Sequence, residues 1–408
     1  MKFYLKLAWK NVLRNKRRTI IASIAIGVGL ASLILTDAFM IGMKNNLVNS
    51  ATSTLLGEAQ IHSKNFRISQ DVEKTILKKD EVIKELNSDR EVQSFSERVV
   101  SLGMITSPLT AESVILYGID PEKDKYLSKI DDRIDKGTYF GNVGNREIII
   151  GSKLSEVLEV SIGDRVVVTV AQAFSGDLSQ EMFRISGIYR FNVKEMDSGM
   201  IFVRKKRAQE MLNLGDEIHE IAIKFNNLRF AENKKNIFWE KYSTKGNEAA
   251  SWTELMPELK NVLDMTDISL YMMGGILFLV VIFGIINSLF MSLYERMFEF
   301  GILKAVGTRP SGLRKLIIFE AGWLAIISCV IGILLGFVAS IILLKYGIDY
   351  GGIELSGAYI HEKIFPVMNI RQYIKYPLFV FIITVVVGIY PAFVAGKMKV
   401  IDALRKSM

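Results

Sequence analysis

The stretch YERMFEFGILKAVGTRPSGLRKLIIFE, residues Tyr294 to Glu320, is charged and interrupted by glycine, yet it lies between two long apolar runs. A block of this kind can neither face lipid nor fill a protein core, because charged side chains are costly to place in an apolar medium. It therefore predicts a cytoplasmic connector between two membrane helices, with surface residues available to something outside the membrane.

Four apolar segments of the chain are long enough to cross a bilayer, which takes about 20 residues. They are residues 19–43, 268–293, 316–344 and 376–395. Because residues 44–266 are polar and mix strand-like with helix-like patterns, we predict an α-helical membrane protein with four transmembrane helices plus a large mixed α/β extracytoplasmic domain inserted between helices 1 and 2. The other predicted segments are an interfacial helix (1–18), the connector (294–315), an extracytoplasmic loop (345–375) and a cytoplasmic tail (396–408).

The distribution of charge predicts the orientation. Residues 1–18 carry Lys and Arg but no acid, and such basic flanks remain in the cytoplasm. Four crossings return the C-terminus to the same side, so we expect a multi-pass protein of the cell inner membrane with both termini cytoplasmic. The net charge of +8 follows from this topology and does not indicate nucleic-acid binding.

The polar region predicts a domain of short strands with helical insertions. Strands are expected at 114–117, 147–150, 165–170, 182–189, 200–203 and 220–225, and helices at 71–87, 152–160, 204–214 and 231–243.

Motifs for enzyme chemistry are missing from the sequence. No Walker A loop is present, and the segment from His361 to Phe365 lacks the second histidine of a zincin site. Cys329 is the single cysteine, and Asp131 and Asp132 lie in a charged loop typical of solvated carboxylates. We expect no catalytic residue, no metal site and no cofactor bound by this chain, so the energy for any work must come from elsewhere.

The N-terminal segment predicts an amphipathic helix along the inner leaflet. Its basic stripe contains Lys6, Lys10 and Arg14, which recur every four residues, while Trp9 lies on another side. The alternative is a basic flank that topology alone requires.

Small and polar residues inside the apolar segments suggest further roles. A spacing of four indicates close helix packing, and it relates Ala25 to Gly29 in the first segment and Ser328, Gly332, Gly336 and Ser340 in the third. Asp37 lies in the outer third of the first segment. It either reaches the outer headgroups or faces a cavity of the helix bundle that handles substrate.

The connector itself predicts a short helix at residues 295–306. Phe298, Ile302, Leu303 and Val306 fall on one side of it, and the charged residues fall around the other. Gly307 is the expected C-terminal stop.

The residues of this connector resemble the signature of FtsX-like ABC transporter permeases. The matching pattern is Glu295-Arg296-x-x-Glu299-x-Gly301-Ile302-Leu303-Lys304-Ala305-x-Gly307, directly after an apolar segment. Further segments resemble the family in the same order along the chain, namely 7–19, 118–121, 251–252, 390–397 and 401–405.

This resemblance implies a permease subunit that is not itself an enzyme. It would pair with a second permease subunit, as a homodimer or with a paralogue, and with two copies of a cytoplasmic ABC ATPase that bind ATP and Mg²⁺. The residues implied in coupling to the ATPase are Glu295, Arg296, Glu299, Gly301, Lys304, Ala305 and Gly307.

Within the family the layout is most similar to the lipoprotein-releasing LolC/LolE group. That likeness implies lipoprotein cargo extracted from the outer leaflet of the inner membrane, and a periplasmic carrier. The alternatives are an exporter of peptides or hydrophobic compounds, and an FtsX-like mechanotransmitter that controls an extracytoplasmic partner.

Overall fold

The computed structural model describes residues 1–141, 144–349, 353–355, 358–360 and 363–398. Its contacts divide the chain into two compact units. The helical unit comprises Met1–Asn45, Asp264–Tyr350 and Glu362–Met408, and the α/β unit comprises Asn46–Leu263 and Gly351–His361. The family-like segment at 401–405 lies outside the described residues.

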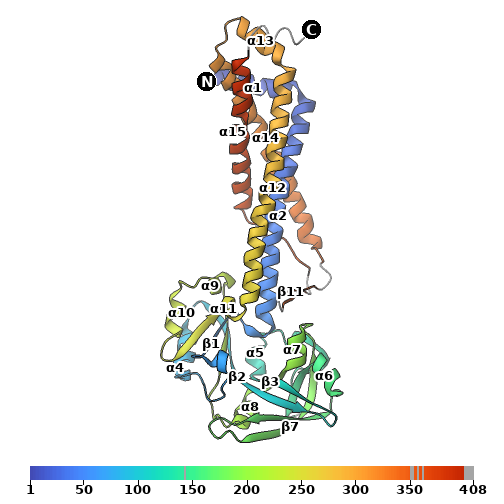
Figure 1. The fold of residues 1–408 in the computed structure, drawn as a ribbon, viewed down its shortest axis with the longest axis vertical. Coiled ribbons are helices and arrows are strands. Elements are labelled where there is room, and N and C mark those ends of the chain that lie inside the picture. Colours follow the sequence, from blue (N-terminus) through green and yellow to red (C-terminus); the bar gives the residue numbers. More distant parts are fainter. Residues whose placement is uncertain (142–143, 350–352, 356–357, 361–362, 399–408) are drawn as a thin grey trace. The chain divides into compact units, whose positions relative to one another are not determined.

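Four long helices form the helical unit, and two shorter ones accompany them at one end (Figure 1). They are α1 (Lys2–Arg14), α2 (Lys16–Ala51), α12 (Pro257–Glu295), α13 (Met297–Ala305), α14 (Pro310–Tyr346) and α15 (Gln372–Lys397). The four long ones are apolar enough to cross a membrane, which confirms the four predicted candidate spans among the described residues. Both α2 and α12 extend beyond their apolar parts, and the extensions belong to the α/β unit.

The helices pack closely where α14 carries small residues. Ser328, Gly332, Gly336 and Ser340 are all buried, and a Cβ atom added at Gly332 would come within 2.7 Å of Leu30. Gly29 faces α12, because an added Cβ atom would lie 2.3 Å from Val281.

Ala25 is exposed, in contrast to the other small residues predicted to pack. The face of α2 that meets its neighbours runs instead through Ala22, Ile26, Leu30 and Ile34. Since 3.6 residues make one helical turn, Ala25 lies off this line.

The α/β unit is built on one branched sheet and several short helices. Its strands are β1 (Ala59–Ser63), β2 (Val92–Thr106), β3 (Ala111–Ile119), β4 (Ile134–Gly137), β5 (Glu147–Gly151), β6 (Arg165–Ala171), β7 (Leu178–Tyr189), β8 (Met200–Arg204), β9 (Glu220–Phe225) and β10 (Asn247–Ser251). Its helices are α3 (Phe66–Ser69), α4 (Lys79–Ser88), α5 (Pro121–Asp124), α6 (Ser152–Leu158), α7 (Lys194–Gly199), α8 (Lys205–Leu212), α9 (Leu228–Glu232), α10 (Ile237–Tyr242) and α11 (Trp252–Leu255), with a π-helical turn η1 (Thr52–Leu56) and a 3-10 turn η2 (Asp131–Arg133). A separate hairpin, β11 (Ile353–Leu355) with β12 (Ala358–Ile360), completes the described elements.

The long strand β2 organises this sheet. Its first half pairs with β9, and its second half pairs with β3 on one side and β6 on the other. Because β6 also pairs with β7, the path β2–β3–β8–β5–β7–β6 closes into a ring. Ile105, Val168 and Phe183 are fully buried on strands of the ring, whereas an aromatic cluster that includes Tyr117, Tyr189 and Phe202 forms a second core region.

The six predicted strands are confirmed, but the sequence pattern did not predict β1, β4, β10 or the long strand β2. Glu97 and Arg98 in its centre suggest a solvated segment, yet both are buried. The predicted helix at 71–87 is wrong in its first half, since the helix begins only at Lys79, after the left-handed residue Lys78. The predicted helix at 231–243 is interrupted, because α9 ends at Glu232 and α10 starts at Ile237.

Candidate functional site

The short helix predicted in the connector is present as α13. Its C-terminal end is the turn at Gly307, which has a φ of +99°. The Gly307 amide donates to the Lys304 carbonyl at 3.0 Å, and the Thr308 amide donates to the Leu303 carbonyl at 2.9 Å. Glycine adopts this left-handed conformation without steric cost, which explains why the helix ends there. Pro310 then begins α14.

A buried ion pair fixes α13 to α14. Nη1 of Arg296, the residue that precedes α13, donates to both carboxylate oxygens of Glu320 at 2.8 and 2.9 Å. Both side chains are almost wholly buried. The guanidinium also donates through Nε to Glu299 at 3.0 Å and lies 4.9 Å from the ring centre of Phe300. Such a charge is stable here because each buried donor and acceptor has a partner.

The N-terminal helix joins the same cluster. The Asn11 side-chain amide donates to Glu320 at 2.6 Å, so this carboxylate links α1, α13 and α14. Arg14 forms an ion pair with Glu299, and Arg18 forms one with Glu295 at 2.8 Å. We call these seven residues the α13 cluster: Asn11, Arg14, Arg18, Glu295, Arg296, Glu299 and Glu320.

The pKa values of the cluster reflect these contacts. Burial alone would lower the pKa of Arg296, but the charges of Glu320 and Glu299 raise it above its usual value. Burial would likewise raise the pKa of Glu299, yet hydrogen bonds from Arg296 and Arg14 bring it below the usual range. Both groups therefore remain charged at neutral pH.

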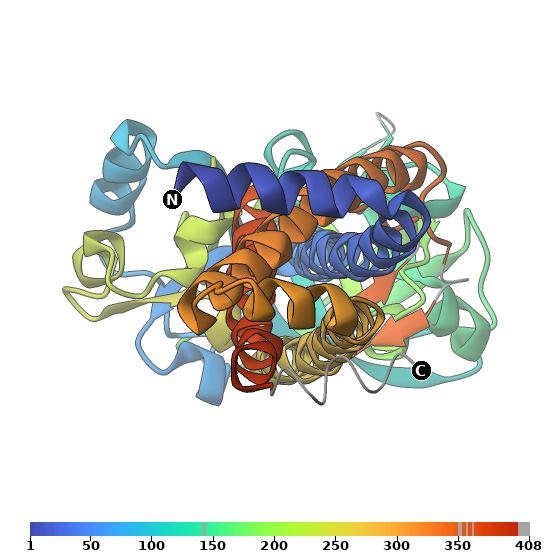
Figure 2. The same cartoon turned by 90° about the horizontal axis from the view of Figure 1, so that it is seen from above.

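The helix α1 lies across the end of the bundle, as Figure 2 shows from above. Its Trp9 ring packs on Trp323 of α14 with 4.6 Å between ring centres, and the Trp323 indole donates to the Leu5 carbonyl at 3.3 Å. Lys6 and Lys10 are exposed. The helix thus has an anchored face and a basic face, and its contact with lipid stays a prediction.

The other predicted coupling residues divide between the inner and outer sides of α13. Gly301 is buried, and the Lys304 ammonium donates to the Gly396 and Met398 carbonyls at 2.9 and 2.5 Å. Ala305 is exposed, as are three apolar side chains spaced by four, Phe298, Ile302 and Val306. We call these three the apolar stripe of α13.

Glu320, Asn11 and Arg18 are the members of the cluster that sequence reasoning did not assign to a site. A single acid inside the long apolar run of α14 is the signal that could have identified Glu320, because a carboxylate there requires a partner. The partner, Arg296, is 24 residues earlier in the chain.

The structure places Asp37 in the lining of a cavity of about 710 Å³ between α2, α12 and α15. Lys44 and Asp267, which also line it, form an ion pair at 2.7 Å. The cavity is large enough for a small amphiphilic ligand, since ligand sites commonly measure about 300–1,000 Å³.

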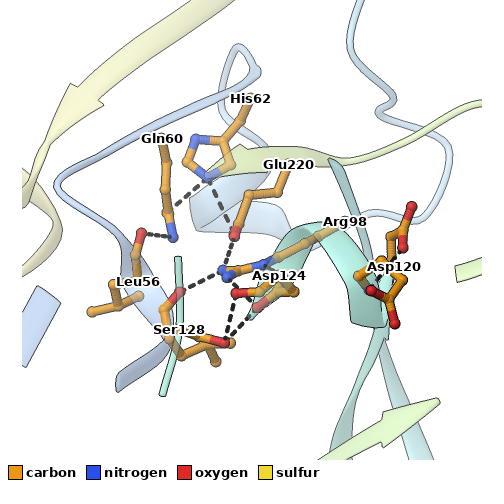
Figure 3. Close-up of polar contacts among 10 residues, drawn as sticks. Leu56, Gln60, His62, Arg98, Asp120, Asp124, Ser128 and Glu220 are labelled. Carbon is orange, nitrogen blue, oxygen red and sulfur yellow. Dashed lines mark hydrogen bonds and ion pairs between the residues drawn. The ribbon is translucent and has the colours of Figure 1, made fainter. Parts of the chain in front are cut away.

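A second buried cluster lies in the α/β unit and surrounds Arg98 (Figure 3). The Arg98 guanidinium donates to both oxygens of Asp124 at 2.8 and 3.1 Å and to Glu220 at 3.0 Å. It also donates to the Leu55 carbonyl in η1, and His62 lies 3.6 Å from Glu220. The arginine is fully enclosed, so this cluster joins β1, β2, β9, α5 and η1 as a scaffold.

Among the described residues, no group of three or more His, Cys, Asp or Glu side chains is arranged to hold a metal ion. Two of the histidines, His62 and His219, both stack on the ring of Phe66, with 6.0 and 5.1 Å between ring centres. Both polar clusters contain carboxylates that are neutralised by arginine, which suits them to hold elements together.

Comparison with known proteins gives matches along most of the chain. A family model for the FtsX-like permease C-terminal region matches residues 271–400, and a model for the MacB-like periplasmic core domain matches residues 19–229. The periplasmic region of MacB from Actinobacillus actinomycetemcomitans, a solved structure, covers 52% of this chain with 96% of its own length, at 15% identity and a TM-score of 0.35.

Curated relatives share low identity over long alignments. The ABC transporter permease YtrF of Bacillus subtilis is 25% identical over 359 residues, which cover 79% of this chain and 72% of YtrF. The lipoprotein-releasing system transmembrane protein LolE of Haemophilus influenzae is 19% identical over 358 residues, which cover 84% of each chain. LolC of Neisseria meningitidis is 19% identical over 330 residues, which cover 78% of this chain and 76% of LolC.

Proposed function

This chain belongs to the FtsX-like permease family of ABC transporters, and on that premise we propose that α13 receives the motion of a separate ATPase subunit. The single observation that carries this proposal is the two-sided character of α13. Its inner side is fixed by the buried pair of Arg296 with Glu320, while its outer side presents the apolar stripe. A partner seated on that stripe would bury apolar area, which favours association.

The α13 cluster supports a rigid connection behind this surface. Because Glu320 accepts hydrogen bonds from Arg296 and from Asn11, a displacement of α13 would also move α14 and α1. The outer ion pairs join Glu299 to Arg14 and Glu295 to Arg18. They would hold the N-terminal segment, including α1, in place during that movement. In this assignment the two glutamates act on their own chain, and the ATPase contacts the stripe.

We propose that two ATPase subunits, which bind ATP and Mg²⁺, act on a pair of permeases, and that this pair releases lipoproteins from the outer leaflet of the inner membrane. The relatives named LolC and LolE support this cargo. Lipid anchors contribute about 0.8 kcal/mol per buried CH₂, so extraction of several acyl chains needs an external energy source. The α/β unit would lie outside the cytoplasm and pass cargo to a carrier.

A mechanotransmitter is the second candidate, and one observation favours it. Both α2 and α12 continue as unbroken helices from the helical unit into the residues of the α/β unit. A continuous helix can transmit motion without any cargo. In that case the α/β unit would act on an extracytoplasmic partner.

Association with the ATPase can be tested on the stripe. We expect the double variant Phe298→Asp with Val306→Asp to lose co-purification of a Walker-A-containing subunit while the permease still reaches the membrane. The matched control places Asp at two exposed apolar positions of the α/β unit, Leu109 and Leu178. Full recovery of the ATPase with the stripe variant would overturn the proposal.

The cargo can be tested by depletion of the permease in its host. Lipoprotein release predicts that lipoproteins accumulate in the inner membrane fraction. Normal lipoprotein sorting combined with altered cell-wall hydrolysis would instead establish the mechanotransmitter.

A further inference from the structure

We propose that the cavity between α2, α12 and α15 binds an amphiphile that carries a positively charged amine, and that Asp37 is its counter-ion. This inference deepens the proposed function and rests on it only in treating the bound amphiphile as cargo. Binding itself is a property of the helical unit and can be measured without any ATPase.

The walls of the cavity suit an acyl chain. They consist mainly of apolar side chains from the three helices, and Phe278 of α12 stacks on Phe379 of α15 with 4.7 Å between ring centres. Leu33, Leu378 and Ile382 extend the apolar surface. Burying each CH₂ of an acyl chain against such walls favours binding.

Two adjacent glycines keep one wall open. Gly274 and Gly275 of α12 both line the cavity, and a Cβ atom added at either position would have no other atom within 4 Å. The space in front of them is therefore unfilled by the chain itself. Larger residues at these positions would occupy the cavity without a clash in the protein.

The charged side chains at the polar end of the cavity determine which sign of charge the ligand should carry. The ammonium of Lys44 and the carboxylate of Asp267 neutralise each other. Lys375 is exposed near the start of α15, where water can hydrate it, and it lies 5.3 Å from the ring centre of Tyr376. Asp37 is half-buried and, among the described residues, has no ion-pair partner; the hydroxyl of Tyr376 is hydrogen-bonded to it.

A carboxylate in this position needs a cation to balance it. An unpaired charge is costly in an apolar setting, and the cost falls when a positive group approaches. The aromatic faces of Tyr271 and Tyr376 in the same lining can also attract an ammonium group. An amine attached to an acyl chain satisfies both ends of the cavity at once.

The experiment uses the full chain in dodecyl maltoside micelles, which contain no choline lipid. Three photoreactive probes share a dodecyl chain and differ in the head: trimethylammonium, maltoside and sulfate. Mass spectrometry measures labelling of the peptides that contain residues 267–278 and 375–382. We expect about tenfold more labelling by the ammonium probe than by the maltoside probe, which corresponds to about 1.4 kcal/mol.

Two pairs of variants make the test specific. Asp37→Asn should reduce ammonium labelling to the maltoside level, whereas Glu258→Gln, an exposed carboxylate outside the cavity, should leave it unchanged. Gly275→Leu should block all three probes at the cavity, whereas Gly284→Leu, which also has open space on α12 but lies outside the lining, should not.

The same assay distinguishes the natural sources of the amine. Competition by phosphatidylethanolamine points to a bilayer lipid, and competition by a diacylated peptide with a free amino terminus points to lipoprotein cargo; either result supports the proposal. Equal labelling by all three probes, preference for sulfate, or an unchanged Asp37→Asn variant would overturn it. Failure of the proposed transport function would appear instead as lost ATPase association or normal lipoprotein sorting, with ammonium labelling intact.

Discussion

Each unit of the molecule contains a buried arginine, and these two arginines, Arg98 and Arg296, differ in what surrounds them. Arg98 is fully enclosed, and its partners Asp124 and Glu220 are buried as well. Arg296 is also buried with Glu320, but the chain of contacts continues from it to Glu299, whose side chain is 40% exposed. One cluster is closed, and the other opens onto the surface.

This difference separates a scaffold from a connection that can be rearranged. Breaking a closed, buried pair leaves uncompensated charge and costs about 3–5 kcal/mol, whereas an exposed pair contributes about 0–1 kcal/mol. The Arg98 cluster therefore has no low-energy alternative. The outer pairs of the α13 cluster can exchange partners at small cost while the inner pair holds the helices together.

The largest expected effect is that of Arg98→Met in the α/β unit. The variant leaves Asp124 and Glu220 buried without their cation, and we expect the free energy of opening of β2 and β9 to fall by about 3–5 kcal/mol. Amide hydrogen exchange on the full chain measures this change. Arg190→Met is the matched control, because Arg190 forms an exposed pair with Asp135 and should cost less than about 1 kcal/mol.

The pH dependence of the same variant provides a check on the cause. Burial would raise the pKa of Glu220, but His62 and Arg98 bring it below the usual value. Its contribution to stability is therefore complete above the unfolded pKa, about 4.3, and is lost as pH falls through the folded pKa. In Arg98→Met the pKa of Glu220 should rise because the arginine no longer lowers it, so the difference in stability from the wild type should shrink as pH falls from the raised pKa of the variant through the lowered pKa of the wild type. A difference that is constant with pH would contradict this explanation.

An intermediate effect is expected from Arg296→Met. The Glu320 carboxylate loses its cation but keeps the hydrogen bond from Asn11, so we expect a loss of about 2–3 kcal/mol, which is less than at Arg98. Because the α13 cluster links α1 to α14, protease cleavage near Arg14 should become faster in this variant. If Arg296→Met proved as costly as Arg98→Met, the contrast between an open and a closed cluster would be wrong.

A smaller effect separates contact within the chain from contact with the ATPase. Glu295→Arg faces Arg18 with a like charge, yet it should lower the stability of the permease by less than about 1 kcal/mol because the Glu295 side chain is exposed. Combining it with Arg18→Glu restores the attraction with the charges exchanged. We expect co-purification of the ATPase to recover in the double variant. Recovery would fail if Glu295 bound the ATPase directly.

The sequence predicted one of these clusters far better than the other. The α13 helix, its stop at Gly307 and the four candidate spans follow from periodicity, glycine and apolar length, all of which are local signals. Glu320 and Asn11 could not be assigned in the same way, because their contacts join residues far apart in the chain. The Arg98 cluster was missed entirely, since a charged residue within a strand suggests exposure until its partners are known.

The last expected effect is confined to the backbone at Gly307, whose turn sets the direction from α13 into α14. Its φ of +99° disfavours any residue with a Cβ atom, although an added Cβ would meet open space, so Gly307→Ala should cost about 1–2 kcal/mol through backbone strain alone. Gly284→Ala in α12 is the matched control. It also adds a methyl group in open space, but the backbone there is helical, so it should be neutral or stabilising by up to about 1 kcal/mol. Thermal unfolding of both variants in micelles compares the two, and equal shifts would mean that the turn at Gly307 does not constrain the α13 cluster.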